Sequence, residues 1–509
     1  MNNSNNNKKI ICAIDFGTSR TGAAWMISIG NISRNQIVPT DINLSINNDT
    51  TQWVLTVPAI WEDKAKEIMR RAFYQAGLIS SKKSPNLLFC YEPEVAAIDF
   101  FQDQRNQLSQ FNNKKLLVVD AGGGTIDITL MKPTIVNNEI KEFEILMIPK
   151  GGDFGSIYID QEFQKFFQSF LNLNDNQFKE LKNKCPKGFL KLSNQWESLK
   201  MGIQSNEMTE DDSHLIEISF DIRKYLKKTN SALNVEDLVN QFNQRNRNSG
   251  LSRIKWEDEE DCLEIYGDRI KSFFEKPIQK LRNYLNNLKQ TSEIFKQTEI
   301  VFFTGGLSNS DYFRKSVQKQ LGNNYQYCKS PYPDKSILIG AVFFGFDPNI
   351  VSIRRSQFTY GKITCPIFNP EIHDKNRKTI IKNGNNQEIE RCGGVFSPIL
   401  FKGDVIRLSE PILKVSIPVY ENQKAINFQI VRTTKKWDPK LKSLYIDSQG
   451  VQKMGSVRVP FPESNIPRNK QEVEVAFHFA TTEIKIFMKY LPDPTITRQL
   501  TLSYDQMEN

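Results

Sequence analysis

The chain has few histidines and no closely spaced cysteine pair. Three of its 509 residues are His, and its seven Cys are scattered without a Cys-x-x-Cys motif. Protein zinc sites use closely spaced Cys and His ligands, and disulfide frameworks use paired cysteines. We therefore expect His214, His373 and His478 to be surface or core residues, and we expect reduced thiols in a cytoplasmic protein. The cysteines are Cys12, Cys90, Cys185, Cys262, Cys328, Cys365 and Cys392.

Long apolar runs are also absent. The longest, Leu338 to Phe346, contains two glycines and is far shorter than the roughly 18 residues that a membrane span requires. The Asn-rich residues 1–8 lack the apolar core of a signal peptide, and we expect them to be disordered. The net charge is +9, but the basic residues form small, dispersed clusters without interleaved aromatics. Neither a membrane span nor nucleic-acid binding is predicted.

The most informative segment that is present is LLVVDAGGGTIDITLM, from Leu116 to Met131. An apolar strand ends at Asp120, three glycines follow, and polar and apolar residues then alternate as in a half-buried strand. Glycine permits positive φ, so consecutive N–H groups can converge on an anion such as phosphate. The nearby acids Asp120 and Asp127 favour a metal ion, which would offset their repulsion. A plain tight hairpin is the alternative reading.

A second segment has the same pattern. From Ile10 to Trp25 an apolar strand ends at Asp15, and Gly17, Thr18 and Ser19 follow. Two strand–acid–glycine–hydroxyl hairpins about a hundred residues apart indicate a duplicated unit that binds a phosphate ligand between its halves.

The rest of the chain changes character near residue 355. Strand and helix patterns alternate before the glycine hairpin, which indicates an α/β domain over residues 9–350 with a smaller inserted subdomain at 172–265. Within it, a buried strand ends at Gly305-Gly306 before a capped helix, an arrangement suited to close backbone approach to a ligand. Short alternating segments separated by turn residues then predict a sandwich-like β domain over residues 355–509.

With these motifs in this order, the chain resembles the actin-like ATPase superfamily, specifically the heat-shock protein 70 family and its divergent subfamily 12. The resemblance covers nearly the whole chain. It implies a duplicated actin-like (ribonuclease H-like) ATPase domain with a truncated first lobe, followed by the β domain. The segments that carry it, besides the hairpins, are TQWVLTVPAIW, AFYQAGL, GAVFFGFDP and RRSQFTYG.

The resemblance implies ATP or ADP and Mg²⁺ as cofactors, and it assigns roles by position. Asp15 and Asp120 would hold Mg²⁺ through its waters. Thr125 and Asp127 would place the attacking water, and Glu92 would contact the same water shell. The phosphate loops would be formed by Gly17, Thr18, Ser19, Gly122, Gly123 and Gly124, with Gly155 beside them. Phosphoryl transfer to water depends mainly on such positioning and charge neutralisation.

The resemblance also implies an adenosine site and a link to the neighbouring domain. Glu197 and Lys200 resemble helix residues that contact the ribose, and Pro58 with Lys66 resembles the pair that connects nucleotide state to the next domain. The adenosine loop would contain Gly305, Gly306 and Ser308, with Asp334 in its closing segment.

Three departures from the family pattern bear on activity. Only Ile27 to Gln52 separates the first hairpin from the next strand, where the family has a subdomain with a catalytic lysine. The two adenine-stacking arginines are matched by Met201 and roughly by Asn309, so cation–π stacking is weaker. The helical lid of the family is not recognisable.

Three functions follow from this reading. The first is an ATP-hydrolysing, chaperone-like protein whose β domain binds a polypeptide client, with a nucleotide-exchange factor as a second partner. The second is a non-hydrolysing nucleotide-binding scaffold or sensor. The third is a small-molecule kinase, although no further acid is placed as a base for a substrate hydroxyl.

Overall fold

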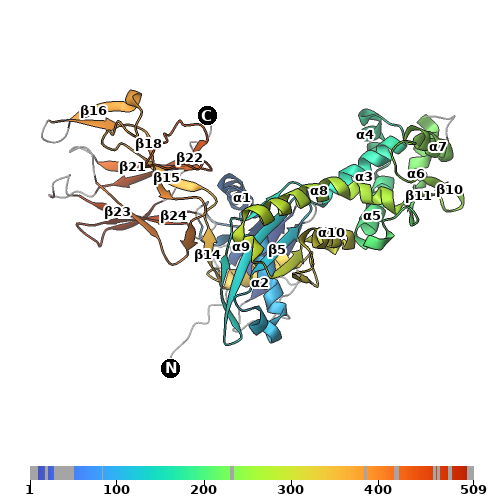
Figure 1. Cartoon of the computed structure of the whole chain (residues 1–509), viewed down its shortest axis with the longest axis horizontal. Coiled ribbons are helices and arrows are strands. Elements are labelled where there is room, and N and C mark those ends of the chain that lie inside the picture. The colour runs from blue at the N-terminus through green and yellow to red at the C-terminus, as the bar shows by residue number, and fades with distance from the viewer. Residues whose placement is uncertain are drawn as a thin grey trace. The chain divides into compact units, whose positions relative to one another are not determined.

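The computed structural model describes residues 10–17, 21–27, 51–82, 84–229, 234–382, 387–417, 424–461, 466, 471–479 and 484–500. Thr18 and Ser19, and the tail expected to be disordered, lie outside these described residues. The chain divides into two compact units (Figure 1). Unit 1 contains residues 1–110, 114–130 and 150–346, and unit 2 contains residues 111–113, 131–149 and 347–509.

The first sheet of unit 1 carries the first glycine hairpin. Its strand order is β2-β1-β3-β4, with β1 and β2 antiparallel and the other neighbours parallel. Helix α1 ends at Gln75 and is capped by Ala76. Gly77 follows with φ +71°, and the N–H of Leu78 donates to the carbonyl of Phe73 at 3.0 Å, as in a glycine-terminated helix. The elements are β1 (Ile10–Phe16), β2 (Thr21–Ile27), β3 (Thr51–Val57), β4 (Leu87–Tyr91), α1 (Asp63–Gln75) and α2 (Glu92–Asp103).

The second sheet of unit 1 carries the second glycine hairpin. Here the strand order is β13-β12-β5-β6, and β8 pairs with the first residues of β6. Strands β12 and β5 are parallel, and their register places Thr304 beside Asp120. The strands are β5 (Leu116–Ala121), β6 (Ile126–Val136), β8 (Lys150–Gly152), β12 (Ile300–Thr304) and β13 (Gln326–Lys329).

The expectation that the strand after the glycines is half-buried was wrong. Asp127 and Thr129 are 1% and 0% exposed, as buried as their apolar neighbours in β6. The loop that follows β3 covers Asp127, whose carboxylate accepts a hydrogen bond from the N–H of Ile60. Gly151 covers it too, because a Cβ on Gly151 would lie 2.7 Å from Asp127 Oδ1. Sequence alternation identified the polar face but not what packs on it.

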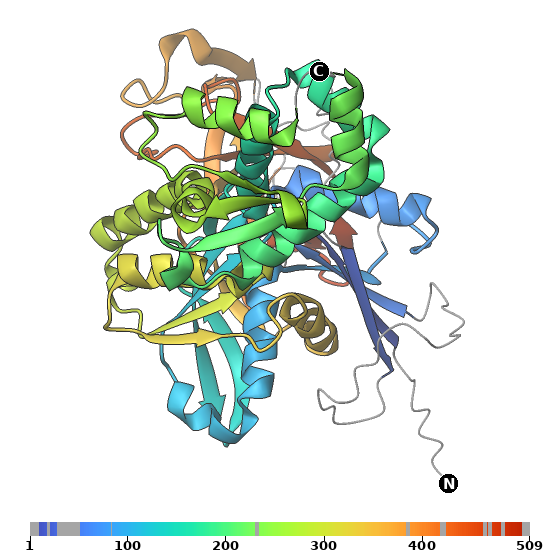
Figure 2. The same ribbon diagram turned by 90° about the vertical axis from the view of Figure 1, so that its right-hand side faces the viewer.

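Helix α11 (Ser336–Phe346) lies between α2 and the first sheet, where Figure 2 shows it end on. Small residues permit this close packing. A Cβ on Gly340 would lie 1.8 Å from the carbonyl oxygen of Val95, and one on Gly345 would lie 2.5 Å from Ile11.

The remaining elements of unit 1 include the region 172–265. An aromatic core joins α3 to α5, and Phe163 stacks on Trp196 with ring centroids 4.3 Å apart. A three-stranded sheet has the order β10-β11-β9. The elements are α3 (Ser156–Phe170), α4 (Asp175–Lys184), α5 (Pro186–Gly202), β9 (Ser213–Glu217), α6 (Phe220–Thr229), α7 (Val235–Arg245), β10 (Lys255–Glu257), β11 (Cys262–Tyr266), α8 (Gly267–Thr291), α9 (Glu293–Lys296) and α10 (Asp311–Leu321).

Unit 2 begins earlier in the chain than the expected border at residue 355. It includes residues 131–149 because the end of β6 pairs with β7 (Glu139–Ile145), and β7 pairs with β14 (Val351–Arg355). It includes residues 111–113 because Asn113 donates to the carbonyl of Pro133 and Asn112 accepts from Ile135. Strand β14 also pairs with β19 (Val405–Arg407).

The rest of unit 2 consists mainly of antiparallel strands. One sheet has the order β18-β15-β21-β22 and another has the order β20-β23-β24-β25, and both contribute side chains to one hydrophobic core. The strands are β15 (Thr359–Thr364), β16 (Lys378–Lys382), β17 (Glu388–Cys392), β18 (Val395–Leu400), β20 (Ile412–Ser416), β21 (Ala425–Thr433), β22 (Val451–Pro460), β23 (Val473–His478), β24 (Lys485–Tyr490) and β25 (Thr497–Leu500), with β16 and β17 forming a hairpin.

All seven cysteines are free thiols, and five of them are buried. Across the described ranges, no helix combines the length and the apolar character needed to cross a bilayer.

Candidate functional site

Four carboxylates meet in unit 1. Asp15 is in β1, Glu92 begins α2, Asp120 is in β5 and Asp127 is in β6. Burial raises the pKa of Glu92 well above its usual range, and the charges of Asp120, Asp15 and Asp127 raise it further. Charges raise one another's pKa values only over short distances, so these four carboxylates lie close together. The acids of the two glycine hairpins, which are distant in sequence, therefore meet at the start of α2.

The other three acids also have raised pKa values. Burial, then Asp127 and Asp15, raise the pKa of Asp120 well above its usual range. Burial raises the pKa of Asp127 to about 7, although the hydroxyl of Thr125 donates to its Oδ2 at 3.1 Å. Burial raises the pKa of Asp15, against a 2.7 Å hydrogen bond from Thr56. No Lys or Arg of the described chain is among the groups that shift these four pKa values.

The carboxylate cluster contains acceptors without partners. Within the described ranges, Oδ1 of Asp120 and Oδ1 of Asp127 are buried and accept no hydrogen bond. Each such atom costs about 1–3 kcal/mol, which a cation or its waters would offset. The described residues offer no set of three acid, His or Cys donors that could ligate a metal directly. Mg²⁺ usually retains several of its waters, so the cluster fits a hydrated Mg²⁺ held through those waters.

The glycine loop Gly122–Gly124 is held against the start of α3. Its three carbonyl oxygens accept hydrogen bonds from the N–H groups of Gly155–Ile157 at 2.9 to 3.2 Å. Gly155 has to be glycine here, because a Cβ would lie 2.6 Å from the carbonyl oxygen of Gly123. With the carbonyls turned toward the helix, the N–H groups of Gly123 and Gly124 make no hydrogen bond within the described chain. These two donors are available to an anion.

The end of β12 lies directly beside the acids. Gly305 has φ +80°, and a Cβ there would lie 2.5 Å from Asp120 Oδ1. Its N–H donates to the carbonyl of Pro333 at 3.1 Å, which places the segment with Asp334 next to the same strand end. A Cβ on Gly306 would meet open space. Ser308 is fully buried, and its hydroxyl donates to the carbonyl of Thr304 at 2.5 Å, so it stabilises the loop from inside.

Lys200 is at the centre of a polar network between α3 and α5. Its fully buried side chain contacts Ser156 Oγ at 2.7 Å, Asp160 Oδ1 at 2.6 Å and Glu197 Oε2 at 2.5 Å. These contacts use the three donors of the ammonium group, so Lys200 positions Glu197. Sequence reasoning missed Asp160, although it follows Ser156 by four residues and therefore shares its helix face.

A cavity of about 640 Å³ connects this network to the glycine loop. Gly123, Asp160 and Glu197 line it at the polar end, and Trp196 and Phe163 are among its aromatic residues. The indole of Trp196 donates to Asp160 at 2.8 Å. The structure therefore brings a predicted phosphate-loop residue and a predicted ribose contact into one cavity.

A hydrogen bond joins the end of α5 to the start of α10. The N–H of Ser205 donates to Asp311 Oδ2 at 3.0 Å, which places the residues after Met201 near the loop that contains Asn309. Sequence analysis missed the cation here. Arg314 donates to the carbonyl oxygens of Ser308 and Asn309 at 2.7 and 2.8 Å, from a helix position with no distinctive signal.

Lys66 and the loop at Pro58 both adjoin the acids. Lys66 is buried and donates to the hydroxyl of Tyr91 at 2.8 Å, one residue before Glu92. The loop after Pro58 supplies the N–H of Ile60 to Asp127. The pair singled out from the sequence thus contacts elements that hold two of the four carboxylates.

Tyr284 on α8 is a further residue that the sequence did not indicate. Its hydroxyl is buried without a hydrogen-bond partner among the described residues. Burial raises its pKa, and the charge of Asp127 raises it further, so the phenol lies near that carboxylate. A tyrosine within an amphipathic helix is ordinarily a packing residue, which is why its place near the acids has no sequence signal.

Comparisons with known proteins agree with this architecture. A family model described as Hsp70 protein matches residues 36–249. The chain is 25% identical to heat shock 70 kDa protein 12A of Homo sapiens over an alignment 492 positions long, which covers 86% of this chain and 68% of that protein. The Mus musculus 12A protein has the same identity and coverage. Heat shock 70 kDa protein 12B of Homo sapiens is 23% identical over an alignment 519 positions long, which covers 91% of this chain and 71% of that protein.

Proposed function

Because the chain belongs to the heat-shock protein 70 family, as a divergent member similar to the 12A and 12B proteins, we propose that it binds ATP and ADP with Mg²⁺ at the carboxylate cluster. One observation carries the proposal. Four carboxylates with raised pKa values lie together, and within the described residues no Lys or Arg shifts those pKa values. Beside them, the N–H groups of Gly123 and Gly124 make no hydrogen bond to a described residue. A phosphate chain with its cation supplies the acceptors and the positive charge that the site lacks.

Each part of the site then has a role. Asp15 and Asp120, with Glu92 beside them, hold the hydrated Mg²⁺, which neutralises charge on the phosphates when it is bound. The N–H groups of Gly123 and Gly124 donate to phosphate oxygens. Asp127, whose pKa is about 7, orients the attacking water and accepts its proton at neutral pH. The Thr125 hydroxyl fixes the orientation of that carboxylate.

The adenosine end of the ligand is proposed to lie toward α5 and α10. Glu197, held by Lys200, contacts the ribose. Gly305 and Gly306 permit close approach of the backbone, and the segment with Asp334 closes the site. Asn309 replaces a stacking arginine, so the base is held with less cation–π energy than in the family pattern.

We further propose that nucleotide state is coupled to the β-rich unit, in a chaperone-like cycle. In this view the amino-terminal domain has a truncated first lobe, and the β strands form a sandwich that binds a polypeptide client. Strand β6 supports the coupling because it starts beside Asp127 in unit 1 and continues into unit 2 after Leu130. A nucleotide-exchange factor is the second proposed partner.

Binding is tested by calorimetric titration of the full chain with ATP, ADP and no nucleotide, with and without Mg²⁺. Gly123→Val is expected to abolish the Mg²⁺-dependent heat and the rise in melting temperature, because a branched side chain occupies the space of the phosphate. Gly393→Val is the matched control, since a Cβ at Gly393 meets open space in unit 2. Equal melting shifts in wild type and Gly123→Val would count against the site.

A nucleotide-binding scaffold or sensor with little turnover is the second candidate. Within the described chain, no Lys or Arg is among the groups that shift the pKa values of the acids, and this favours the scaffold or sensor. One missing electrostatic donor lowers a rate by about 10²- to 10³-fold. Single-turnover ATP hydrolysis separates the candidates. A wild-type rate equal to that of Asp127→Asn supports the scaffold, and a faster wild-type rate supports the ATPase.

A further inference from the structure

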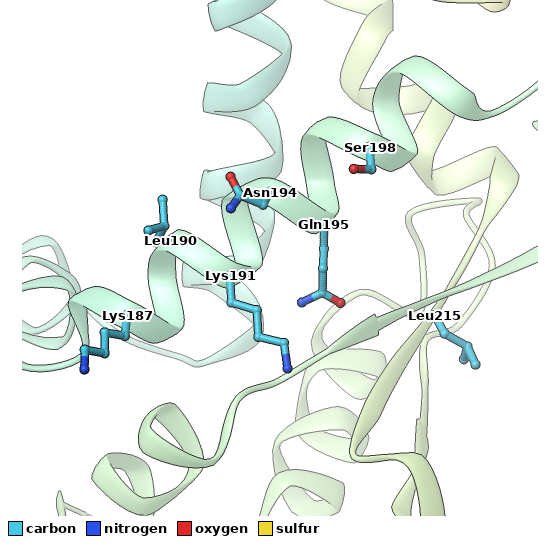
Figure 3. A pocket seen from close by; sticks show the side chains of 7 residues that line it. All are labelled: Lys187, Leu190, Lys191, Asn194, Gln195, Ser198 and Leu215. Atoms are coloured by element: carbon cyan, nitrogen blue, oxygen red, sulfur yellow. The ribbon is translucent and has the colours of Figure 1, made fainter.

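The outward face of α5 and one edge of β9 form a second groove, which shares Leu190 and Asn194 with the cavity of about 640 Å³. Residues of α5 at helical spacing line one side, and Leu215 of β9 lines the other, around a cavity of about 560 Å³ (Figure 3). In Figure 3 the side chain of Gln195 points from the helix toward the strand. The α5 residues are Lys187, Leu190, Lys191, Asn194, Gln195 and Ser198.

The groove exposes the edge of a sheet. Strand β9 pairs with β11 on one side, and no strand of the described chain pairs with its other side. At Glu217 a side chain takes the place of a neighbouring strand. Gln195 Nε2 donates to the carbonyl of Glu217 at 3.2 Å, and the N–H of Glu217 donates to Gln195 Oε1 at 2.9 Å. One amide thus makes both hydrogen bonds that an added strand would make at this position.

The next outward position has no such substitute. Backbone groups alternate between the two edges of an antiparallel strand, so Leu215 points its N–H and C=O to the same side as Glu217. The N–H of Ile218 donates to the carbonyl of Asp261, just before β11. The backbone N–H and C=O groups of the even-numbered residues of β9 therefore face β11, and those of the odd-numbered residues face outward. Among the described residues nothing pairs with the outward N–H and C=O of Leu215.

The walls of the groove are apolar and cationic. Leu190 is 63% exposed and Leu215 is 45% exposed, which is unusual for two leucines that line one cavity. Lys191 is paired with Glu217 at 2.5 Å, whereas Lys187 makes no ion pair within the described ranges. The groove therefore combines unpaired strand-edge groups, apolar contact area and one uncompensated positive charge.

We propose that this groove binds an extended segment of a partner polypeptide, which adds to β9 as an antiparallel or parallel strand. Its main chain pairs with Leu215, an apolar side chain packs on Leu190 and Leu215, and a carboxylate pairs with Lys187. The face of α5 from Lys187 to Ser198 is about 16 Å long, the span of about five residues of extended chain. This site lies outside the proposed client-binding unit.

The test uses the full chain and a display library of random nine-residue peptides. Binders are selected on wild type and counter-selected on Leu215→Pro. Proline removes only the outward N–H, a substitution that edge strands tolerate. Leu215→Thr is the matched control, because it changes the side chain and keeps the N–H. Lys187→Glu is a helix-surface variant that tests the charge without any strain on the strand.

Selected peptides are expected to alternate apolar and acidic residues. They should bind wild type and Leu215→Thr at least tenfold more tightly than Leu215→Pro, and Lys187→Glu should weaken binding of acidic peptides several-fold. If Leu215→Pro melts well below wild type, N-methylation of alternate peptide amides replaces it as the test of main-chain pairing. The proposal would be overturned if no peptide is enriched after counter-selection. It would also be overturned if the selected peptides bind equally tightly after the loss of main-chain pairing and after Lys187→Glu. Dimerisation of wild type that Leu215→Pro abolishes would make a second copy the occupant and would also overturn it.

Discussion

At the scale of single residues, the main feature of the candidate site is its cluster of carboxylates. Folding confines Asp15, Glu92, Asp120 and Asp127 in one place, and each of them has a raised pKa. A raised pKa means that the folded state disfavours the charged form. The cluster therefore costs stability at neutral pH in the absence of a cation, and a bound cation would offset that cost.

Asp127→Asn is expected to flatten the pH dependence of stability. The pKa of Asp127 is about 7 in the folded chain, against an ordinary aspartate value of 3.8, so between about pH 4 and 7 the folded state keeps a proton that the unfolded state loses. Raising the pH through this window therefore lowers the free energy of unfolding, by up to about 1.4 kcal/mol per pH unit from this residue. The penalty is absent below about pH 4 and complete above about pH 7.

Urea unfolding at several pH values between 5 and 8 measures this effect. The variant should be more stable than wild type at pH 8, by an amount on the order of 2–4 kcal/mol, and the difference should shrink toward pH 5. Thr125→Val is a useful control, because it removes a hydrogen bond to Asp127 and leaves the carboxylate in place. Parallel stability profiles for wild type and Asp127→Asn would contradict the account.

The sequence predicted part of this site and missed part of it, for a physical reason. Asp15, Asp120 and the glycines are contiguous in short hairpins, so local pattern reveals them. Three further residues reach the site from separate helices, namely Asp160, Tyr284 and Arg314. A single acid, phenol or cation on a helix surface has no local sequence signature. Alternation in β6 likewise gave the polar face but could not reveal that Ile60 and Gly151 cover Asp127.

At the scale of elements, strand ends and helix starts determine the site. The end of β5 meets the end of β12 through parallel pairing at Thr304 and Asp120, and the glycine loop meets the start of α3. Strand and helix identities were readable from periodicity. The pairing order of the strands was not readable in this way, because the whole of the inserted region 172–265 lies between the neighbours β5 and β12 in the chain.

The glycines at the end of β12 provide a paired comparison. Gly305→Ala is expected to destabilise the chain by about 1–3 kcal/mol from backbone strain alone, because φ is +80° and a Cβ would contact Asp120. Gly306→Ala should leave stability nearly unchanged, since its Cβ meets open space. Thermal unfolding of both variants measures the difference. Similar melting temperatures for the two would show that the backbone at Gly305 is not constrained as described.

Gly306→Ala should instead affect the ligand. If adenosine approaches the backbone at this loop, the added methyl group weakens ATP binding while the fold is retained. Calorimetry on Gly306→Ala therefore tests the adenosine end of the site separately from the phosphate end, which Gly123→Val tests.

At the scale of the whole molecule, the two units are joined by continuous chain segments. Strand β6 belongs to unit 1 up to Leu130 and to unit 2 from Met131. The change of sequence character near residue 355 led us to expect a separate β domain from that residue on. It did not predict that residues 131–149 group with that region, because their partner strand β14 is some two hundred residues away in the chain.

Nucleotide state is expected to change the β-rich unit. Hydrogen exchange of the full chain, measured with ATP, with ADP and without nucleotide, should show altered exchange in residues 359–500 as well as around the glycine loop. Gly123→Val should show neither change. A nucleotide effect confined to residues 10–346 would contradict the chaperone-like cycle and leave the sensor function.

The contact between the glycine loop and α3 has a mechanical consequence. Because the loop carbonyls cap the first turn of a 15-residue helix, the loop cannot shift without tilting that helix. A tilt of a few degrees at the first turn becomes a displacement of an ångström or so at the far end, about 22 Å away. A movement of the glycine loop is therefore expected to displace the far end of α3. Because Lys200 of α5 contacts Ser156 and Asp160 of α3, that displacement would also reach α5.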